Sequence, residues 1–121
     1  MRITDVTLTL FAWDGIAPTS YGKHTGQFGG QSQLGLLEIT TDQGLVGRAF
    51  LGSARHSAHV DAQGLIAYLK PLLMGRDPLD REQLNKAMWG RARVASIRCI
   101  GAVDIALWDI AGQAANLPIH A

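Results

Sequence analysis

The sequence has few of the features that mark secreted, membrane-embedded or nucleic-acid-binding proteins. Its 121 residues include a single cysteine, which excludes an internal disulfide and is typical of a reducing compartment. No apolar run reaches the roughly 18 residues that a membrane span needs, and the N-terminus lacks the apolar core of a signal peptide. With 11 basic and 10 acidic residues the formal net charge is +1, which indicates no polyanionic partner such as nucleic acid. We therefore expect one soluble, cytoplasmic domain.

Clusters of residues that could hold a metal ion or carry out catalysis are also missing. No pair of histidines has the spacing of a zinc site with companion ligands; they stand at His24, His56, His59 and His120. Cys99 lies among apolar residues, as a small core residue does. Asp104 and Asp109 are more than a helical turn apart, so we expect them to bind backbone or arginine groups and not to act as paired carboxylates. The sequence predicts no catalytic or metal-binding residue in this chain.

Alternation of apolar and polar residues predicts three strands. Residues 3–13 alternate as a half-buried strand does. Residues 34–41 and 45–51 form a hairpin, and its turn contains Gly44, which can adopt a positive φ. We therefore expect a three-stranded antiparallel meander.

The segment between the first two strands has a different character. Residues 16–32 show no periodicity and are rich in glycine, which predicts a long loop. One interpretation is a plain hairpin connection. The other is a functional loop, because a purely flexible linker has no use for Tyr21, His24 and Phe28.

Three helices are expected after the strands. The first spans residues 58–74, where Pro71 is expected to kink or end it and Gly75 to stop it. The second begins with Asp77 as N-cap and extends to about residue 91. Ser96 can cap the third. The whole pattern predicts an α+β domain in which a three-stranded meander is followed by a three-helix layer on one face.

The last predicted helix is the most distinctive stretch of the chain. Gly112 interrupts its apolar pattern, which suggests the close approach of another backbone or helix. Asn116 suits a left-handed C-terminal position, and Pro118 stops the helix beyond it. A helix built so well is not needed only to present a chain end, so we expect a further domain after residue 121. The apolar face repeats at helical spacing, at Val103, Leu107, Ile110 and Ala114.

This stretch closely resembles the first signature of the mandelate racemase/muconate lactonizing group of the enolase superfamily. Cys99 departs from the pattern, since the family usually has alanine there. A chance match over so many spaced positions is very improbable. The matching residues are Gly101, Ala102, Val103, Asp104, Ala106, Leu107, Asp109, Ile110, Gly112, Gln113, Pro118 and Ile119.

The resemblance implies that residues 1–121 form an N-terminal capping domain whose catalytic (β/α)₈-type barrel lies outside this chain. In the family, the barrel carries Lys or His bases and a Mg²⁺ ion held by acidic residues, and it removes the proton α to a carboxylate. The capping domain excludes water and selects the distal part of the substrate. This chain alone is therefore expected to be inactive and to bind no metal, and the full-length protein is expected to be a homo-oligomeric enzyme.

The resemblance also points to substrate-binding residues in two loops. The loop between the first two strands closes over the barrel mouth in the family, and residues 17–30 correspond to it, with Tyr21, Lys23 and His24 as candidates. A second capping loop corresponds to residues 51–56, where Arg55 and His56 could donate hydrogen bonds to an anionic substrate. The alternative is that Ser53 or Ser57 caps the next helix while both side chains are merely solvated.

These polar side chains favour a sugar acid over an apolar substrate such as mandelate, because they suit hydroxyl and carboxylate groups. Within the family we therefore favour a sugar-acid dehydratase. The alternatives are a racemase, epimerase or cycloisomerase of the same family, or a stand-alone binding module without catalysis.

Overall fold

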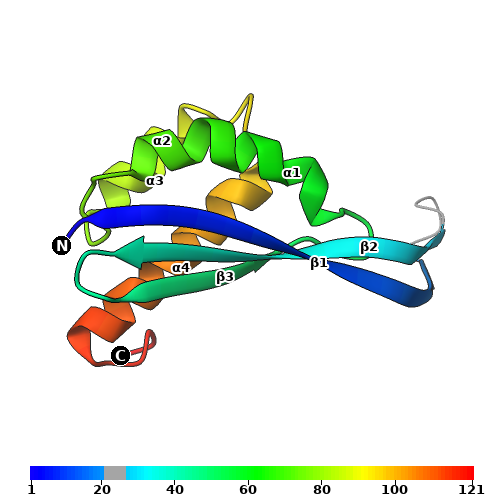
Figure 1. Cartoon of the computed structure of the whole chain (residues 1–121), viewed down its shortest axis with the longest axis horizontal. Helices are drawn as coiled ribbons and strands as arrows, with labels where there is room; N and C mark the ends of the chain where they lie inside the picture. The colour runs from blue at the N-terminus through cyan, green and yellow to red at the C-terminus, as the bar shows by residue number, and fades with distance from the viewer. Residues whose placement is uncertain (21–26) are drawn as a thin grey trace.

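The computed structural model describes residues 1–20 and 27–121 and shows an antiparallel sheet followed by a helical layer (Figure 1). The sheet has the order β1-β2-β3, with β1 (Ile3–Ser20), β2 (Gln27–Thr41) and β3 (Val46–Leu51). The helices are α1 (Ala58–Gly64), η1 (Leu65–Leu69, a π-helical segment), α2 (Lys70–Leu73), α3 (Arg81–Trp89) and α4 (Ile97–Ala115). The predicted α+β architecture is confirmed.

One face of the sheet carries the hydrophobic core. Val6 pairs with Ile39, and Leu37 lies between Leu8 and Ala49, so these side chains share a face of the pleat. The helices cover that face: α1 and α2 lie against β2 and β1, and α4 lies against β3 and β2. The sheet is therefore buried on one side only, as the alternation of the sequence predicts.

The prediction of a long loop over residues 16–32 is wrong. Strand β1 continues to Ser20 and β2 begins at Gln27, so most of this segment is a two-stranded ribbon that extends beyond the helices (Figure 1). The register of the β1–β2 pairing shifts after Trp13 and again after Ile16, and Gly15 between these two residues has a φ of +67°. Because no helix covers the ribbon, neither face needs an apolar row, and the period-2 signal disappears although the backbone pairing continues.

The predicted helix 58–74 is one continuous helix with a change of winding in its middle. Pro71 has no N–H, and its ring would clash with the carbonyl four residues earlier in a regular α-helix. The wider π-helical segment η1 precedes α2, which carries Pro71 in its first turn. Pro71 thus alters the winding without ending the helix, which stops at Leu73. Gly75, with a φ of +76°, follows two residues beyond this end, so its predicted place as the helix stop is confirmed.

The predicted start of the second helix at Asp77 is also wrong. Helix α3 begins at Arg81, with Asp80 as its N-cap residue. The Asp77 carboxylate accepts a hydrogen bond from the backbone N–H of Leu79 at 2.9 Å, and its carbonyl accepts one from Asp80 at 3.2 Å. Asp77 therefore closes a turn before the helix, which is the alternative use of an aspartate beside a proline.

Helix α4 has both predicted caps. Ser96 Oγ accepts a hydrogen bond from the backbone N–H of Cys99 at its start. Asn116 ends the helix with φ 52° and ψ 43°, and the Leu117 N–H returns to the Gly112 carbonyl at 3.0 Å, which forms a Schellman motif. A Cβ on Gly112 would lie 3.1 Å from the Leu117 carbonyl oxygen, so the expected close backbone approach is confirmed.

Two polar side chains of α4 form hydrogen bonds with backbone groups on the free edge of β3. The Arg48 N–H donates to Asp109 Oδ2 at 2.9 Å, and Gln113 Nε2 donates to the Val46 carbonyl at 2.8 Å. An edge strand otherwise leaves such groups unpaired. Asp109 thus binds backbone, as expected, and joins helix and sheet. Gly47 permits this contact, because a Cβ there would overlap the Ala106 carbonyl oxygen. The expectation of a backbone or arginine partner is wrong for Asp104, whose Oδ1 accepts a hydrogen bond from the side-chain amide of Asn85 at 3.3 Å.

An ion pair between the buried Asp61 and the exposed Arg98 joins α1 to α4 beside Cys99. Arg98 donates from Nε to Asp61 Oδ2 at 2.9 Å and from Nη2 to Asp61 Oδ1 at 3.0 Å. Burial raises the pKa of the Asp61 carboxyl, but hydrogen bonds from Arg98 and Ser96 lower it more, so the pKa lies below its ordinary value. Burial also raises the pKa of the Cys99 thiol, which fits its predicted role in the core.

We expect Asp61→Asn to lower the free energy of unfolding by about 1.5–3 kcal/mol at neutral pH, because Arg98 loses a charged partner. A carboxyl with a depressed folded-state pKa stabilises above its unfolded pKa of about 3.9, and that stabilisation is lost as the pH falls through the folded-state value. Urea unfolding at pH 7 and about pH 3 should therefore show the two proteins converging in acid. The half-exposed Asp5, paired with Lys70, is the control, and Asp5→Asn should have a smaller effect. An equal stability loss at both pH values would contradict this account.

Candidate functional site

The structure tests the two predicted loops unequally. Tyr21, Lys23 and His24 lie outside the described residues. Arg55 and His56 lie in the loop between β3 and α1 and are exposed. This loop and the far part of the β1–β2 ribbon lie toward the same end of the domain, away from both chain termini (Figure 1). The described parts of the two predicted loops are therefore brought to one end.

Hydrogen bonds within the loop hold Arg55 and His56 in a tight turn. Ser53 N–H donates to the His56 carbonyl at 2.7 Å, and His56 N–H donates to Ser53 Oγ at 3.1 Å. The hydroxyl of Ser32 ties the turn to β2 by donating to the Ser53 carbonyl at 2.6 Å. Gly52 adopts a φ of +99°, and a Cβ there would lie 2.6 Å from the Gln33 carbonyl oxygen. The loop is thus fixed against the sheet and presents Arg55 and His56 outward.

The predicted capping of α1 by a serine hydroxyl is wrong. Ser57 occupies the N-cap position but makes no side-chain cap. Its Oγ instead accepts the backbone N–H of Gln33 at 2.9 Å and lies 2.8 Å from Nδ1 of His59. The hydroxyl of Ser53 accepts its hydrogen bond from His56 within the β3–α1 loop and does not cap α1 either. The hydroxyl of Ser57 therefore connects strand β2 to the first turn of α1 and does not satisfy the helix terminus.

A depression lies between strands β1 and β2, near the base of the ribbon, and the first turn of α1. We call it the corner depression. Its volume is about 690 Å³, within the range of small-molecule sites. Six of its eight lining residues are polar, and the sequence analysis assigned these residues no part in a binding site. The lining residues are Leu10, Ala12, Asp14, Gln31, Ser32, Gln33, Ser57 and His59.

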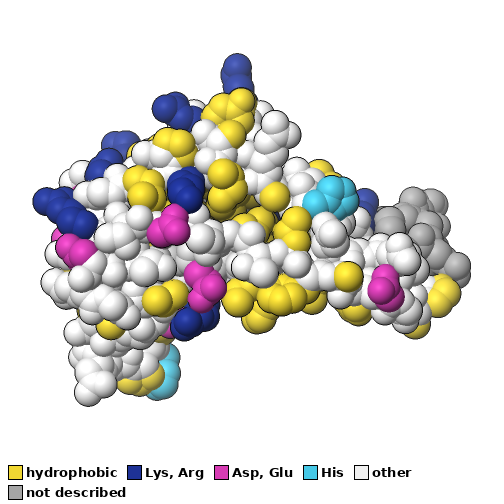
Figure 2. Space-filling model, viewed as in Figure 1, with side chains coloured by type: hydrophobic (Ala, Val, Ile, Leu, Met, Phe, Trp, Pro, Cys, Tyr) yellow, Lys and Arg dark blue, Asp and Glu magenta, His cyan; other side chains and the backbone are white. Residues whose placement is uncertain are grey.

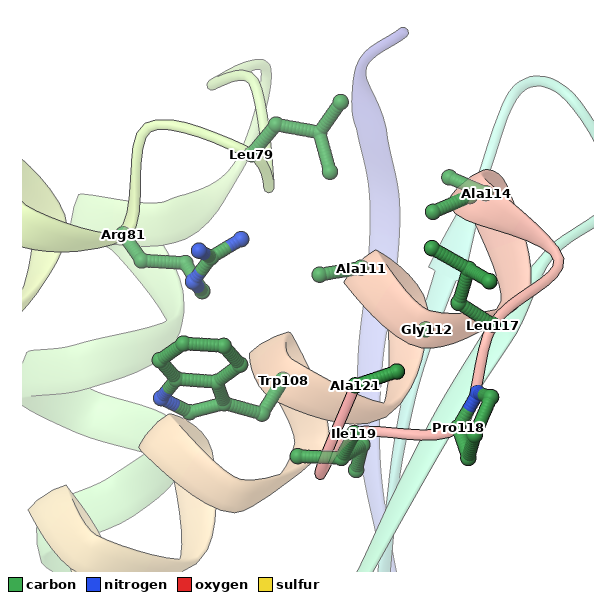
Figure 3. A pocket seen from close by; sticks show the side chains of 11 residues that line it. Leu79, Arg81, Trp108, Ala111, Gly112, Ala114, Leu117, Pro118, Ile119 and Ala121 are labelled. Carbon is green, nitrogen blue, oxygen red and sulfur yellow. The ribbon is translucent and has the colours of Figure 1, made fainter.

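A second depression of about 430 Å³ lies at the other end of the domain, between the start of α3 and the end of α4 (Figure 3). Arg81 stacks over Trp108 there, with the guanidinium carbon 4.0 Å from the ring centroid. Leu79, Leu117 and Ile119 give the remaining wall an apolar character. This chemistry suits packing against another apolar surface and offers little to a hydroxylated ligand.

Apolar side chains also gather on the uncovered side of the sheet (Figure 2). Phe50 of β3 is 72% exposed, and Phe11 and Trp13 of β1 are exposed as well. Helix α4 adds Ile105 and Trp108 on its outer side. Helix α4 and the uncovered face of the sheet therefore both carry exposed apolar side chains.

Neither a metal site nor a membrane helix is found in the described part of the chain. Over residues 1–20 and 27–121, no group of three or more His, Cys, Asp or Glu side chains could hold a metal ion. None of the helices described there has the length and apolar character needed to cross a membrane. The described residues thus do not fit the Mg²⁺ site that the resemblance implies for the whole enzyme.

Comparison with known proteins decides the family. Residues 4–121 match the family described as mandelate racemase / muconate lactonizing enzyme, N-terminal domain. The chain belongs to this family. A solved racemase from Streptomyces coelicolor A3(2) with bound magnesium has the same fold, with a TM-score of 0.75 and 28% identity over 93% of this chain and 32% of its own.

The curated relatives are much longer than this chain. A D-galactonate dehydratase family member from Streptomyces bingchenggensis is 42% identical over 91 residues, which is 69% of this chain and 21% of the relative. A D-mannonate dehydratase from Novosphingobium aromaticivorans is 37% identical over 93 residues, 69% of this chain and 22% of the relative. The chain therefore spans about a fifth of each.

Proposed function

We propose that this chain is the substrate-specifying lid of a Mg²⁺-dependent enolase-superfamily enzyme, and that the enzyme is a sugar-acid dehydratase. The observation that carries the reaction class is the 42% identity to a D-galactonate dehydratase family member over 69% of the chain. The lid role is supported by the arrangement of the domain, in which the ribbon and the β3–α1 loop meet at one end. The proposal includes a cytoplasmic location and assembly into a homo-oligomer.

The larger domain would supply the reacting groups. There a Mg²⁺ ion held by acidic residues would stabilise the charge that develops when a base removes the proton α to the carboxylate. The contribution of this chain is to close over the substrate, exclude water and hold the part of the substrate remote from the reacting carbon. Selectivity then depends on groups that this chain presents.

Within this proposal the exposed residues of the lid have separate tasks. Arg55 would bind a carboxylate or hydroxyl oxygen through its planar, two-pronged donor group. His56, on the same turn, would donate a further hydrogen bond. Tyr21, Lys23 and His24 would act from the other predicted loop. The fixed turn around Ser53 supports this assignment, because a rigid backbone limits the entropy lost when a ligand is bound.

A racemase or epimerase is the second candidate, because a solved racemase with bound magnesium shares the fold at 28% identity. A cycloisomerase and a stand-alone binding module are the remaining alternatives. The protein comprising this chain and its larger domain should be incubated with Mg²⁺ and either D-galactonate or D-mannonate. A dehydratase releases water and gives a 2-keto-3-deoxy acid, whereas an epimerase gives a stereoisomer of unchanged mass. Mass spectrometry with chiral separation of the products distinguishes them, and failure to turn over either acid would contradict the proposed reaction.

A further inference from the structure

Two neighbouring residues of β2 hold the two ends of the turn that carries Arg55. At the start of the turn, Ser32 Oγ donates to the Ser53 carbonyl at 2.6 Å. At its end, the backbone N–H of Gln33 donates to Ser57 Oγ at 2.9 Å. We call these two hydrogen bonds the serine clamp. The clamp joins both ends of the turn to one short stretch of the sheet, although the partners lie 21 and 24 positions apart in the sequence.

The strand residues of the clamp provide a rigid anchor. Ser32 is buried, and it pairs with Trp13 of β1. Gln33 pairs with Ala12, and these are the last two pairs of β1 and β2 before the register first shifts toward the ribbon. Because the clamp contacts the sheet on the regular side of that shift, the turn is fixed to the body of the domain and not to the part of the ribbon beyond it.

On the turn itself, each clamped serine makes a second contact. The Ser53 N–H donates to the His56 carbonyl at 2.7 Å, and the His56 N–H donates to Ser53 Oγ at 3.1 Å. Ser57 Oγ also lies 2.8 Å from His59 Nδ1, and this hydrogen bond can form with the proton on either atom. The Ser57 hydroxyl is therefore held in place whichever tautomer His59 adopts.

Arg55 lies between the two clamped ends, and neither hydrogen bond of the clamp uses its side chain. The backbone of Arg55 is therefore fixed before a ligand arrives, while its side chain is exposed. Ordering a mobile turn when a ligand binds costs conformational entropy, so a turn that is ordered in advance binds more tightly. The clamp thus lowers the cost of any contact that Arg55 makes.

We infer that Ser32 and Ser57 are positioning residues, which act on the substrate through the backbone of the turn that carries Arg55. The inference rests on the proposed function for the identity of the molecule that Arg55 binds. Removing either hydroxyl would release one end of the turn and leave the paired strands in place. Arg55 would then still be present, but its contribution to binding would fall because its backbone is no longer fixed.

Limited proteolysis of the protein that joins this chain to its larger domain tests the clamp without a measurement of activity. Trypsin cuts after arginine, so the bond between Arg55 and His56 reports whether the turn opens. We expect Ser32→Ala and Ser57→Ala each to speed this cut about three- to tenfold, as the loss of one hydrogen bond does. Cutting after the exposed Arg93, in the turn between α3 and α4, should be unchanged. Mass spectrometry of the fragments measures both rates.

Thr41→Val is the matched control, because Thr41 lies in the same strand and its hydroxyl holds the turn at the opposite end of the sheet (Figure 1). Its Oγ1 donates to the Leu45 carbonyl at 3.0 Å and accepts the Leu45 N–H at 3.1 Å. Thr41→Val should therefore lower the stability of the fold, while cutting after Arg55 stays at the parent rate. Ser57→Thr keeps a hydroxyl and should also be cut at nearly the parent rate.

Steady-state kinetics of the same protein with its sugar-acid substrate tests whether the clamp acts through Arg55. We expect Ser57→Ala to lower kcat/KM about three- to tenfold, mainly through a higher KM, because the turn must then be ordered each time substrate binds. In an Arg55→Ala background the same change should have an effect of less than about twofold, since no side chain remains to be positioned. Ser57→Thr should restore most of the loss.

Two results would overturn the inference. One is cutting after Arg55 at the parent rate in both Ser32→Ala and Ser57→Ala. The other is a loss of kcat/KM on Ser57→Ala that is equally large with and without Arg55, which would show that Ser57 acts elsewhere. The proposed function fails separately: if the longer protein turns over neither D-galactonate nor D-mannonate, the dehydratase is refuted, while proteolysis still decides whether the clamp holds the turn.

Discussion

We expect Gly47→Ala to lower the free energy of unfolding by about 3 kcal/mol or more, the largest effect of a Gly→Ala change among the glycines that the structure describes. A Cβ at this position would overlap the Ala106 carbonyl oxygen and lie 2.7 Å from Ile110 Cγ1. Backbone cannot rotate away as a flexible side chain does, so α4 must move off the sheet. That movement would also lengthen the hydrogen bonds that Asp109 and Gln113 make to β3.

Gly101→Ala is the control, because Gly101 lies in α4, the helix that packs against Gly47, and a Cβ on Gly101 would meet nothing within 4 Å. Replacing an exposed helical glycine by alanine should raise the free energy of unfolding by roughly 0.5–1 kcal/mol. Urea unfolding followed by circular dichroism measures both. If Gly47→Ala proved as stable as the parent, the close packing of α4 on β3 would be refuted.

The second large effect concerns catalysis by the protein that joins this chain to its larger domain. We expect Arg55→Ala to lower kcat/KM for the sugar-acid substrate about ten- to a hundredfold, as the loss of one charge-assisted hydrogen bond does. Arg55→Lys should restore only part of the activity, because an ammonium group cannot copy the planar two-pronged donor. Steady-state kinetics with each variant gives these values.

Arg93→Ala provides the control for the Arg55 variants. Arg93 is exposed in the turn between α3 and α4, remote from the β3–α1 loop in the chain, and its removal should leave kcat/KM unchanged. Thermal unfolding distinguishes a binding role from a structural one, since exposed substitutions usually change stability by less than about 0.5 kcal/mol. An unchanged kcat/KM together with a melting temperature lowered by several degrees would show that Arg55 supports the loop and does not bind substrate.

The features predicted correctly are those that depend on neighbours in the chain. The apolar face of α4 follows from helical spacing, and the roles of Ser96 and Asn116 follow from local capping chemistry. The turn at Gly44 is equally local. Such signals need no knowledge of distant contacts, so the sequence alone carries them.

The errors arose where distant structure decides a local choice. Periodicity reports burial and not backbone pairing, so it could not detect the ribbon, which no helix covers. Asp77 can close a turn or cap a helix with the same side chain, and the choice depends on how α2 and α3 are connected in space. Pro71 was expected to kink or end the helix, but the π-helical segment by which the helix accommodates this proline is not a feature that a residue pattern predicts.

The candidate site was predictable only in part, for the same reason. Arg55 and His56 could be named because the β3–α1 loop stands where the family has its second capping loop. The corner depression could not, because it depends on contacts of Ser57 with residue 33 of β2, which lies 24 positions away in the sequence. A short-range signal did exist in the serine and histidine two positions apart, 57 and 59, although such a pair has many other uses.

The central claim is that this chain selects the substrate while the larger domain performs the reaction. The most direct measurement replaces residues 21–26 and 52–57, within the longer protein, by the corresponding loops of the Novosphingobium aromaticivorans D-mannonate dehydratase. The ratio of kcat/KM for D-mannonate to that for D-galactonate is then compared with the parent ratio. We expect the ratio to rise about tenfold or more while water is still eliminated. A folded, active variant with an unchanged ratio would contradict the account.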